Sequence, residues 1–210
     1  MAKLSDQLAS AMAELEDDRV LNLIKERLQA GTSPLEIVRS LQEGMTEVGS
    51  RFETGEYFLS ELVLCGQVMK DAMAELEPHL AGENQEYRGN IVIGTVRGDV
   101  HDLGKNIVVM LLKGAGYNVI DLGVDVPAEK FVQAIKESNA PMVGMSVLLT
   151  GCQDGMKNTI EAVREIGNKV TVVIGGNYVD ETVRNYVGAD YFATNASEAV
   201  KIAEKIFTTK

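Results

Sequence analysis

From residue 91 onward, short apolar runs alternate with stretches of helical periodicity, and this alternation restricts the fold more than any other feature of the sequence. Apolar runs at 91–96, 118–122, 142–147 and 170–174, with a shorter one at 190–193, show no polar alternation. Strands of that kind are buried on both faces, as in a parallel sheet. Helical patterns follow them at 104–114, 127–138, 154–166, 180–187 and 197–207. This order predicts a doubly wound α/β domain over 91–210 with five parallel strands in the flavodoxin-like order 2-1-3-4-5.

Residues 1–77 show helical periodicity instead. Four apolar stripes recur at spacings of three and four residues. Gly31 is a predicted C-cap, and Ser33 is a predicted N-cap with Pro34 at the first helical position. Four amphipathic segments with short connections predict a four-helix bundle. The polar stretch 78–90 predicts a linker between the two domains.

Charge and composition exclude several classes of protein. The 31 Asp and Glu against 20 Lys and Arg give a net charge of −11, which disfavours nucleic acid and anionic lipid as partners. No uncharged apolar run approaches the length of a membrane span, and acidic residues near the start disfavour a signal peptide. Two cysteines cannot form a disulfide framework. We therefore expect a cytoplasmic protein that binds neither nucleic acid nor membranes.

Three segments that follow predicted strands carry small, polar or metal-ligating residues. They are 98–104, 146–151 and 175–177. Ligands of doubly wound sheets bind outside the carboxyl ends of the strands at the switch point, here between the first and third strands. The first segment has neither a P-loop nor a G-x-G-x-x-G pattern, and Ser146 stands where a receiver domain would carry its phosphoacceptor aspartate. Nucleotide binding and phosphorelay are therefore disfavoured.

The first segment contains His101, one of only two histidines, with Asp99 two residues before it. An imidazole on such a loop suits an axial ligand of a transition metal. A carboxylate that accepts the second N–H of the ring fixes its tautomer and raises its basicity. Gly104 would let the next helix begin close to a ligand. A loop histidine that only forms hydrogen bonds fits the same spacing, so both interpretations remain open at this point.

The run from Asp99 to Ile107, DVHDLGKNI, resembles the cobalamin-binding signature of methionine synthase and its relatives. The segments 146–150 and 175–176 match the second and third parts of that signature. The segments 45–52 and 55–62 resemble the helical cap of the same family. The resemblance covers nearly the whole chain. It implies a stand-alone corrinoid protein of a methyltransferase system, with a four-helix cap over 1–77 and a Rossmann-like cobalamin-binding domain over 91–210.

The resemblance also implies roles for individual residues. His101 would replace the cofactor's dimethylbenzimidazole as the lower cobalt ligand, and Asp99 would be its hydrogen-bond partner. The cofactor-binding positions that it implies are Gly98, Asp99, Val100, His101, Asp102, Leu103 and Gly104 below the corrin, Ser146, Leu148, Thr150, Gly175 and Gly176 along the nucleotide tail, Tyr191, Ala193 and Asn195 near the base of that tail, and Phe52, Leu59 and Leu62 over the upper face. Cys152 stands where methionine synthase has a relay serine, and a thiol is the weaker donor and acceptor.

The implied function is to carry a methyl group on cobalt, with the cofactor cycling between a Co(I) corrinoid and methylcobalamin. A substrate:corrinoid methyltransferase would supply the methyl group from a methylamine, methanol, a methoxy-aromatic compound or a betaine. A methylcorrinoid:acceptor methyltransferase would pass it to tetrahydrofolate or a thiol coenzyme, and a reductive activation protein would be a third partner. Such a chain is a methyl-carrier subunit rather than a complete enzyme.

Three other functions stay open. A cobalamin sensor or storage module fits the same binding residues, although no basic DNA-binding segment accompanies them. A cobalamin mutase subunit would need a substrate barrel, which this chain does not contain. A metal hydrolase built on Asp99, His101 and Asp102 would lack a second histidine nearby.

Overall fold

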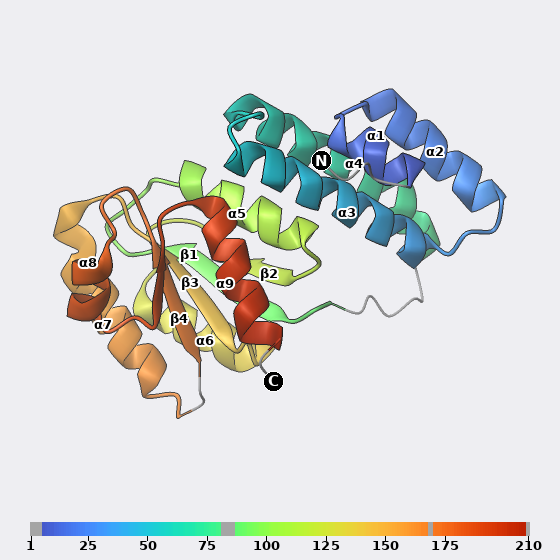
Figure 1. Ribbon diagram of the computed structural model, residues 1–210. Coiled ribbons are helices and arrows are strands. Elements are labelled where there is room, and N and C mark those ends of the chain that lie inside the picture. Colours follow the sequence, from blue (N-terminus) through green and yellow to red (C-terminus); the bar gives the residue numbers. More distant parts are fainter. Residues whose placement is uncertain (1–5, 81–86, 168–169, 209–210) are drawn as a thin grey trace. The chain divides into compact units, whose positions relative to one another are not determined.

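The computed structural model describes residues 6–80, 87–167 and 170–208 (Figure 1). The chain divides into two compact units, an N-terminal helical unit and an α/β unit that begins at Tyr87. Among the described residues, no helix combines the length and apolarity that crossing a membrane would require.

The helical unit confirms the predicted four-helix bundle. It contains α1 (Gln7–Ala13), α2 (Asp17–Gln29), α3 (Pro34–Glu53) and α4 (Leu59–Leu80). Asp6 caps α1 by accepting the N–H groups of Leu8 and Ala9, and Ser33 precedes Pro34 at the start of α3 as predicted. The apolar stripes form the core of this unit, which includes Leu8, Met12, Val20, Ile24, Ile37, Leu41, Val48, Leu62 and Leu76.

Two features mark the ends of helices in this unit. α1 ends at Ala13, and Leu15 adopts a positive φ of 60° where the chain turns toward α2. At the other end, α4 continues through Pro78 to Leu80, inside the range predicted as linker. Proline lacks the N–H that would bond the carbonyl of Ala74, but Ala74 is exposed, so water can take that place. β1 begins at Asn90, the last residue of that range, and 81–86 lie outside the described residues.

The α/β unit contains five parallel strands in the order β2-β1-β3-β4-β5, which confirms the predicted topology. Its elements are β1 (Asn90–Thr95), α5 (Leu103–Gly114), β2 (Asn118–Asp121), α6 (Ala128–Ser138), β3 (Met142–Ser146), the short 3-10 helix η1 (Thr150–Cys152), α7 (Gln153–Arg164), β4 (Thr171–Gly175), α8 (Glu181–Val187), β5 (Tyr191–Ala193) and α9 (Ala196–Thr208). Right-handed crossovers place α5 and α9 on one face of the sheet and α6, α7 and α8 on the other (Figure 1).

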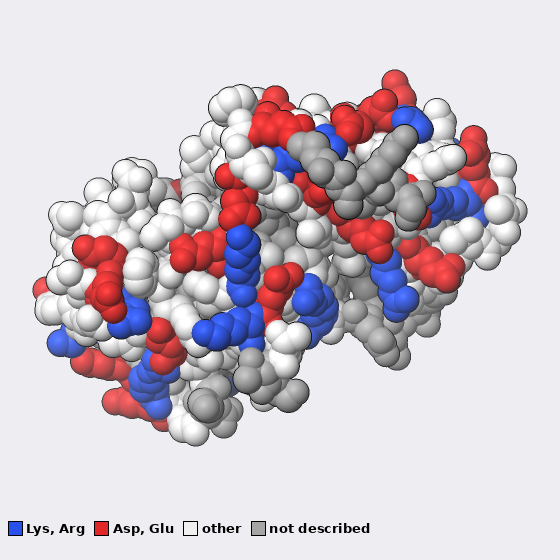
Figure 2. All heavy atoms as spheres, in the orientation of Figure 1, with Lys and Arg blue, Asp and Glu red and all other residues white. Residues whose placement is uncertain are grey.

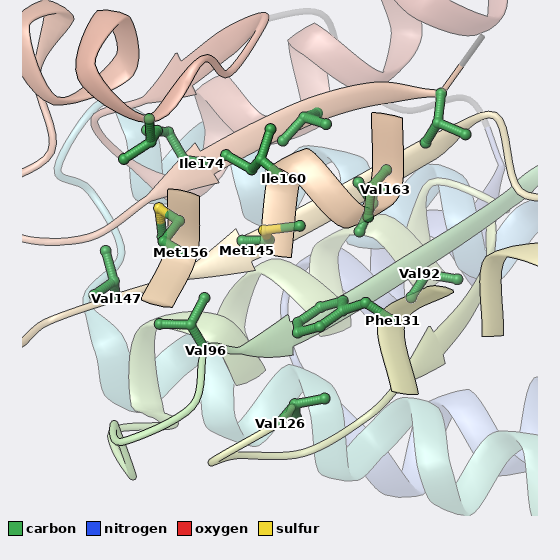
Figure 3. Close-up of a cluster of buried hydrophobic side chains, with 14 of the residues drawn as sticks. Val92, Val96, Val126, Phe131, Met145, Val147, Met156, Ile160, Val163 and Ile174 are labelled. Atoms are coloured by element: carbon green, nitrogen blue, oxygen red, sulfur yellow. The ribbon is translucent and has the colours of Figure 1, made fainter. Parts of the chain in front are cut away.

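The larger hydrophobic core of this unit lies between the sheet and the helices α6 and α7 (Figure 3). Phe131 of α6 and Ile160 of α7 point toward Val92 of β1 and Ile174 of β4. The strands are apolar without alternation because this core covers one of their faces and α5 and α9 cover the other.

Charged side chains of both signs are interspersed on the face of the α/β unit that Figure 2 shows. Lys and Arg side chains gather over α9, and acidic side chains lie among them.

Candidate functional site

The sheet register places several predicted site residues in one row. Thr95 pairs with Ser146, Ser146 with Gly175 and Gly175 with Ala193. These four residues lie at the carboxyl ends of β1, β3, β4 and β5. The three predicted ligand segments therefore leave the sheet at the same edge, next to the switch point between β1 and β3.

The carboxylate of Asp99 joins two of these segments and is fully buried. Its Oδ1 accepts the backbone N–H of His101 at 3.0 Å and lies 2.7 Å from the ring Nδ1 of the same residue. Its Oδ2 accepts the N–H groups of Leu148 at 2.5 Å and Leu149 at 3.0 Å. One carboxylate therefore holds the loop after β1 against the loop after β3, although Leu148 lies 49 residues further along the chain.

These hydrogen bonds determine the charge of Asp99. Burial raises the pKa of its carboxyl, but the N–H groups of Leu148 and His101, the His101 ring and the N–H of Leu149 together lower it from 3.8 to about 2. Asp99 is therefore charged at neutral pH and can only accept hydrogen bonds. In the neutral imidazole of His101 the single ring proton must then be on Nδ1, which leaves the lone pair on Nε2.

The ring of His101 is oriented but still accessible, with 49% of its side chain exposed. Nε2 makes no hydrogen bond to any residue in the described part of the chain. The backbone is fixed as well, because the buried Thr95 donates its hydroxyl to the carbonyl of His101 at 3.0 Å. An imidazole held by a carboxylate on one nitrogen, with a lone pair on the other, is the arrangement of a metal ligand.

The loop after β2 supports the histidine loop, a contribution that the sequence did not reveal. Asp125 accepts the N–H of Gly98 at 2.7 Å, and its own N–H donates to the carbonyl of Asp99 at 2.9 Å. Gly98 and Asp125 both have positive φ, 86° and 52° respectively. The only sequence signal was the pair of turn-forming residue types, which occur at many positions without such a role.

A buried lysine supports the start of α5. Lys105 is 3% exposed, and its Nζ lies within 2.8 Å of both carboxylate oxygens of Asp121 and 2.7 Å from Oδ1 of Asn106. The amide of Asn106 donates in turn to Asp102 at 3.0 Å. The predicted site residue Asp102 is therefore part of a network that ties α5 to the end of β2.

Apolar side chains are exposed beside His101. Val100 is 67% exposed, and Leu103, Leu148 and Leu149 are exposed as well. A Cβ added at Gly104 would meet no protein atom within 4 Å. The protein itself fills none of this space, and an apolar rim around an accessible imidazole suits a large, flat ligand.

The loop after β4 passes very close to the loop after β3. A Cβ at Gly176 would lie 1.7 Å from the carbonyl oxygen of Val147, so only glycine fits there. Gly175 is half-buried in the strand row, whereas Thr150 is exposed at the start of η1. The roles predicted for these residues and for Ser146 along a nucleotide tail stay predictions.

The remaining predicted positions of the α/β unit lie around β5. Ala193 is buried in the strand row, and the Nζ of Lys205 lies 5.3 Å from the ring centre of Tyr191. Asn195 accepts the N–H of Glu198 at 2.8 Å and so caps α9. This cap gives Asn195 a structural role, while its predicted position near the base of the tail stays a prediction.

Three predicted residues belong to the helical unit. Phe52 is half-buried on α3, Leu59 is 38% exposed at the start of α4, and Leu62 is fully buried. Leu62 therefore belongs to the core of its own unit, and only Phe52 and Leu59 have side-chain surface to offer a ligand. Their predicted position over a corrin stays a prediction.

Cys152 makes no hydrogen bond to Asp99 within the residues that the structure describes. Its Sγ lies 3.3 Å from the position that a Cβ of Gly98 would take. Burial and the nearby charges of Asp99 and Asp125 raise the pKa of the thiol. The backbone donors at Leu148 and Leu149, rather than the residue at the relay position, hold the second oxygen of Asp99.

Comparisons with known proteins show which families and structures this chain is similar to. Two family models, each described as a B12 binding domain, match residues 89–202 and residues 4–77. Dimethylamine corrinoid protein 2 of Methanosarcina acetivorans is 38% identical, with 99% of this chain and 98% of that protein covered.

Two solved structures are also similar. A cobalamin-binding protein from Desulfitobacterium hafniense is 38% identical, with a TM-score of 0.76, and the match covers 95% of this chain and 96% of that one. A chain in the crystal structure of the methanol:cobalamin methyltransferase complex MtaBC from Methanosarcina barkeri is 30% identical, with a TM-score of 0.89. That match covers 97% of this chain and 79% of the other.

Proposed function

This chain belongs to the B12-binding corrinoid proteins, and from that premise we propose that it carries a methyl group for a methyltransferase system. The observation that carries the proposal is the oriented ring of His101. Its Nδ1 is bound by a charged, buried carboxylate, and its Nε2 is accessible at the ligand edge of the sheet.

The residues at this edge fit a corrinoid. A corrin already holds its cobalt, so the protein would need to supply only one further donor atom, and Nε2 of His101 would be that atom. The exposed apolar side chains of Val100, Leu103 and Leu148 suit the faces and edges of the macrocycle, and the open space at Gly104 leaves room for it. When bound, the corrinoid supplies a nucleophilic cobalt centre that takes up and releases the methyl group.

The chain's own residues control the axial donor. Asp99 keeps the proton of His101 on Nδ1, which holds the lone pair on Nε2 and raises its basicity. Thr95 and Asp125 hold the backbone of the same loop, so that the ring needs little reorganisation to bind. Asp99, Thr95 and Asp125 would thus control how firmly His101 holds the cobalt.

A carrier works between enzymes, so methyltransferases are its partners. One would present the activated methyl donor, and a second would pass the methyl group to tetrahydrofolate or a thiol coenzyme. A reductive activation protein would restore the lowest cobalt state after accidental oxidation. The similarity to a chain of a methanol:cobalamin methyltransferase complex supports the first of these partnerships.

Reconstitution with hydroxocobalamin tests the proposal. The wild-type chain should retain the corrinoid through desalting and show the absorption spectrum of a base-off form with an axial histidine. His101→Ala should lose that spectrum, while His79→Ala, which removes an exposed histidine of α4, should keep it. A wild-type chain that releases the corrinoid would refute the proposal.

The same preparation separates a carrier from a sensor or storage module. Loaded with methylcobalamin, a carrier should pass its methyl group to an acceptor when a methylcorrinoid:acceptor methyltransferase is added. Loss of the bound methyl group at the same rate with and without that enzyme would favour the sensor or storage alternative.

A further inference from the structure

We propose that Tyr178 is a positioning residue for His101, acting through the backbone of Leu149 and the carboxylate of Asp99. Tyr178 lies in the loop after β4 and was not among the residues that the sequence singled out. The inference rests on the proposed function, because it concerns the same axial donor.

A continuous chain of contacts connects the two side chains. The hydroxyl of Tyr178 donates to the carbonyl of Leu149 at 2.9 Å. The N–H of Leu149 donates to Oδ2 of Asp99 at 3.0 Å, and Oδ1 of Asp99 lies 2.7 Å from Nδ1 of His101. The loops after β4, β3 and β1 are therefore linked in that order, and the link ends at the ring that would bind the metal.

Leu149 needs this support because its side chain is 42% exposed and provides little packing. It lies between the end of β3 and η1, outside regular secondary structure. Its carbonyl is held from two directions, by the Tyr178 hydroxyl and by the N–H of Cys152 at 3.0 Å. A partly exposed segment outside regular secondary structure opens more easily once such bonds are lost.

The geometry at Asp99 makes the position of Leu149 important. Two N–H groups, those of Leu148 and Leu149, must converge on the single oxygen Oδ2. If Leu149 rotates away, Oδ2 loses one of its two donors, and only Leu148 and the bonds of Oδ1 to His101 still restrain the rotation of the carboxylate. Oδ1 then moves relative to Nδ1 of His101, and the ring loses its fixed orientation.

The close approach of the two loops explains how Tyr178 reaches Leu149. The carbonyl oxygen of Val147 lies so near Gly176 that no Cβ fits between them, and the N–H of Val147 donates to the carbonyl of Gly175 at 3.0 Å. Tyr178 follows two residues later. Burial raises the pKa of Tyr178, so its hydroxyl keeps the proton that it donates.

Cys152 does not support Asp99 through its side chain. The resemblance placed a relay residue at Cys152, but that thiol makes no hydrogen bond to Asp99 in the part of the chain that the structure describes. Cys152 contributes its backbone N–H to the same carbonyl that Tyr178 binds. The second oxygen of Asp99 is therefore held by the backbone of Leu149, whose carbonyl accepts the Tyr178 hydroxyl.

Tyr178→Phe removes the hydroxyl that donates to Leu149 and that also contacts the side chain of Gln153, and Tyr186→Phe is the matched control. Tyr186 is also partly exposed, and its hydroxyl donates to Asp154 instead. In the chain without cofactor, NMR would follow hydrogen exchange of the N–H groups of Leu148 and Leu149. We expect roughly two- to tenfold faster exchange at both amides in Tyr178→Phe, the range that loss of one hydrogen bond gives, and no change in Tyr186→Phe.

The second measurement uses chains loaded with cobalamin. The fraction of cobalt(II) with an axial histidine, read from electron paramagnetic resonance, should fall in Tyr178→Phe and stay at the wild-type level in Tyr186→Phe. Unchanged exchange at Leu148 and Leu149 would overturn the proposal, and so would faster exchange with an unchanged axial fraction. If the wild type binds no cobalamin, the proposed function fails, whereas the exchange data still decide whether Tyr178 holds Leu149.

Discussion

Replacing the buried carboxylate at the centre of the site has an effect that depends on pH. Asp99→Asn keeps the shape of the side chain but removes its charge and one of its two acceptor oxygens. The new NH₂ group must face either the N–H groups of Leu148 and Leu149 or the protonated Nδ1 of His101, and both are donors. Loss of hydrogen bonds to a charged group costs about 2–4 kcal/mol in the free energy of unfolding at pH 7.

The lowered pKa of Asp99 gives a second, independent value for its contribution to the free energy of unfolding. A carboxyl with a pKa of 3.8 when unfolded and about 2 when folded contributes roughly 2 kcal/mol to stability. The contribution is complete above pH 3.8 and is lost as the pH falls through the folded value near 2, because the unfolded chain then binds a proton first. At pH 3 about 1 kcal/mol of it should be gone. Asp99→Asn has no such contribution to lose.

Urea unfolding at pH 7 and pH 3, followed by NMR resonances of the α/β unit, measures both effects. The stability difference between wild type and Asp99→Asn should shrink by about 1 kcal/mol at the lower pH. Glu129→Gln, at an exposed carboxylate in the first turn of α6, should show no comparable change. An equal difference at both pH values would show that Asp99 does not titrate with a lowered pKa, which would refute this account of the carboxylate.

Three further changes test other parts of the structure. Gly176→Ala places a Cβ 1.7 Å from the carbonyl oxygen of Val147, so thermal unfolding should show a loss of stability of about 2 kcal/mol or more. Gly151→Ala, which has open space around it, should be tolerated, and equal stability of the two variants would contradict the close approach of the loops. Lys105→Met leaves the partly exposed Asp121 without its cation and should lower the free energy of unfolding in urea by about 1–3 kcal/mol. Lys113→Met, at an exposed lysine, should change it very little, and an equal effect of the two changes would mean that the ion pair of Lys105 and Asp121 does not stabilise the fold. Burial raises the pKa of Cys65 to about 12, so a thiol reagent at pH 8 should modify the partly exposed Cys152 before Cys65. Mass spectrometry would give the order of modification, and modification of Cys65 first would contradict its burial.

The topology could be predicted from the sequence because it depends on patterns along the chain. Apolar runs such as 91–96 and 142–147 have no polar alternation, and this property alone requires a sheet that is covered on both faces. The positions of Asp99 and His101 at the ligand edge followed from the same topology. The end of α4 could not be predicted, because a proline usually ends a helix, and the exposure of Ala74, whose carbonyl loses its partner at Pro78, is visible only in the fold.

The support around Asp99 could not be predicted for a different reason. The donors to Oδ2 are backbone N–H groups, which every residue except proline possesses, so the residue types of Leu148 and Leu149 carry no signal for this role. The hydroxyl of Tyr178 reaches Leu149 across 29 residues of sequence, and only the folded loops bring them together. The sequence therefore indicated His101 as the candidate ligand, while the groups that orient its ring became visible only in the folded structure.

The central claim is that Nε2 of His101 binds the cobalt of a corrinoid, and isotopic labelling of histidine tests it most directly. The chain would be produced with nitrogen-15 histidine, loaded with cobalamin and reduced to cobalt(II). In the electron paramagnetic resonance spectrum, the nitrogen splitting should change from the triplet of nitrogen-14 to the doublet of nitrogen-15, and His79→Ala should leave that doublet intact. A triplet that persists in the labelled wild type would show that the axial nitrogen belongs to the cofactor's own base, and the account of this site would be wrong.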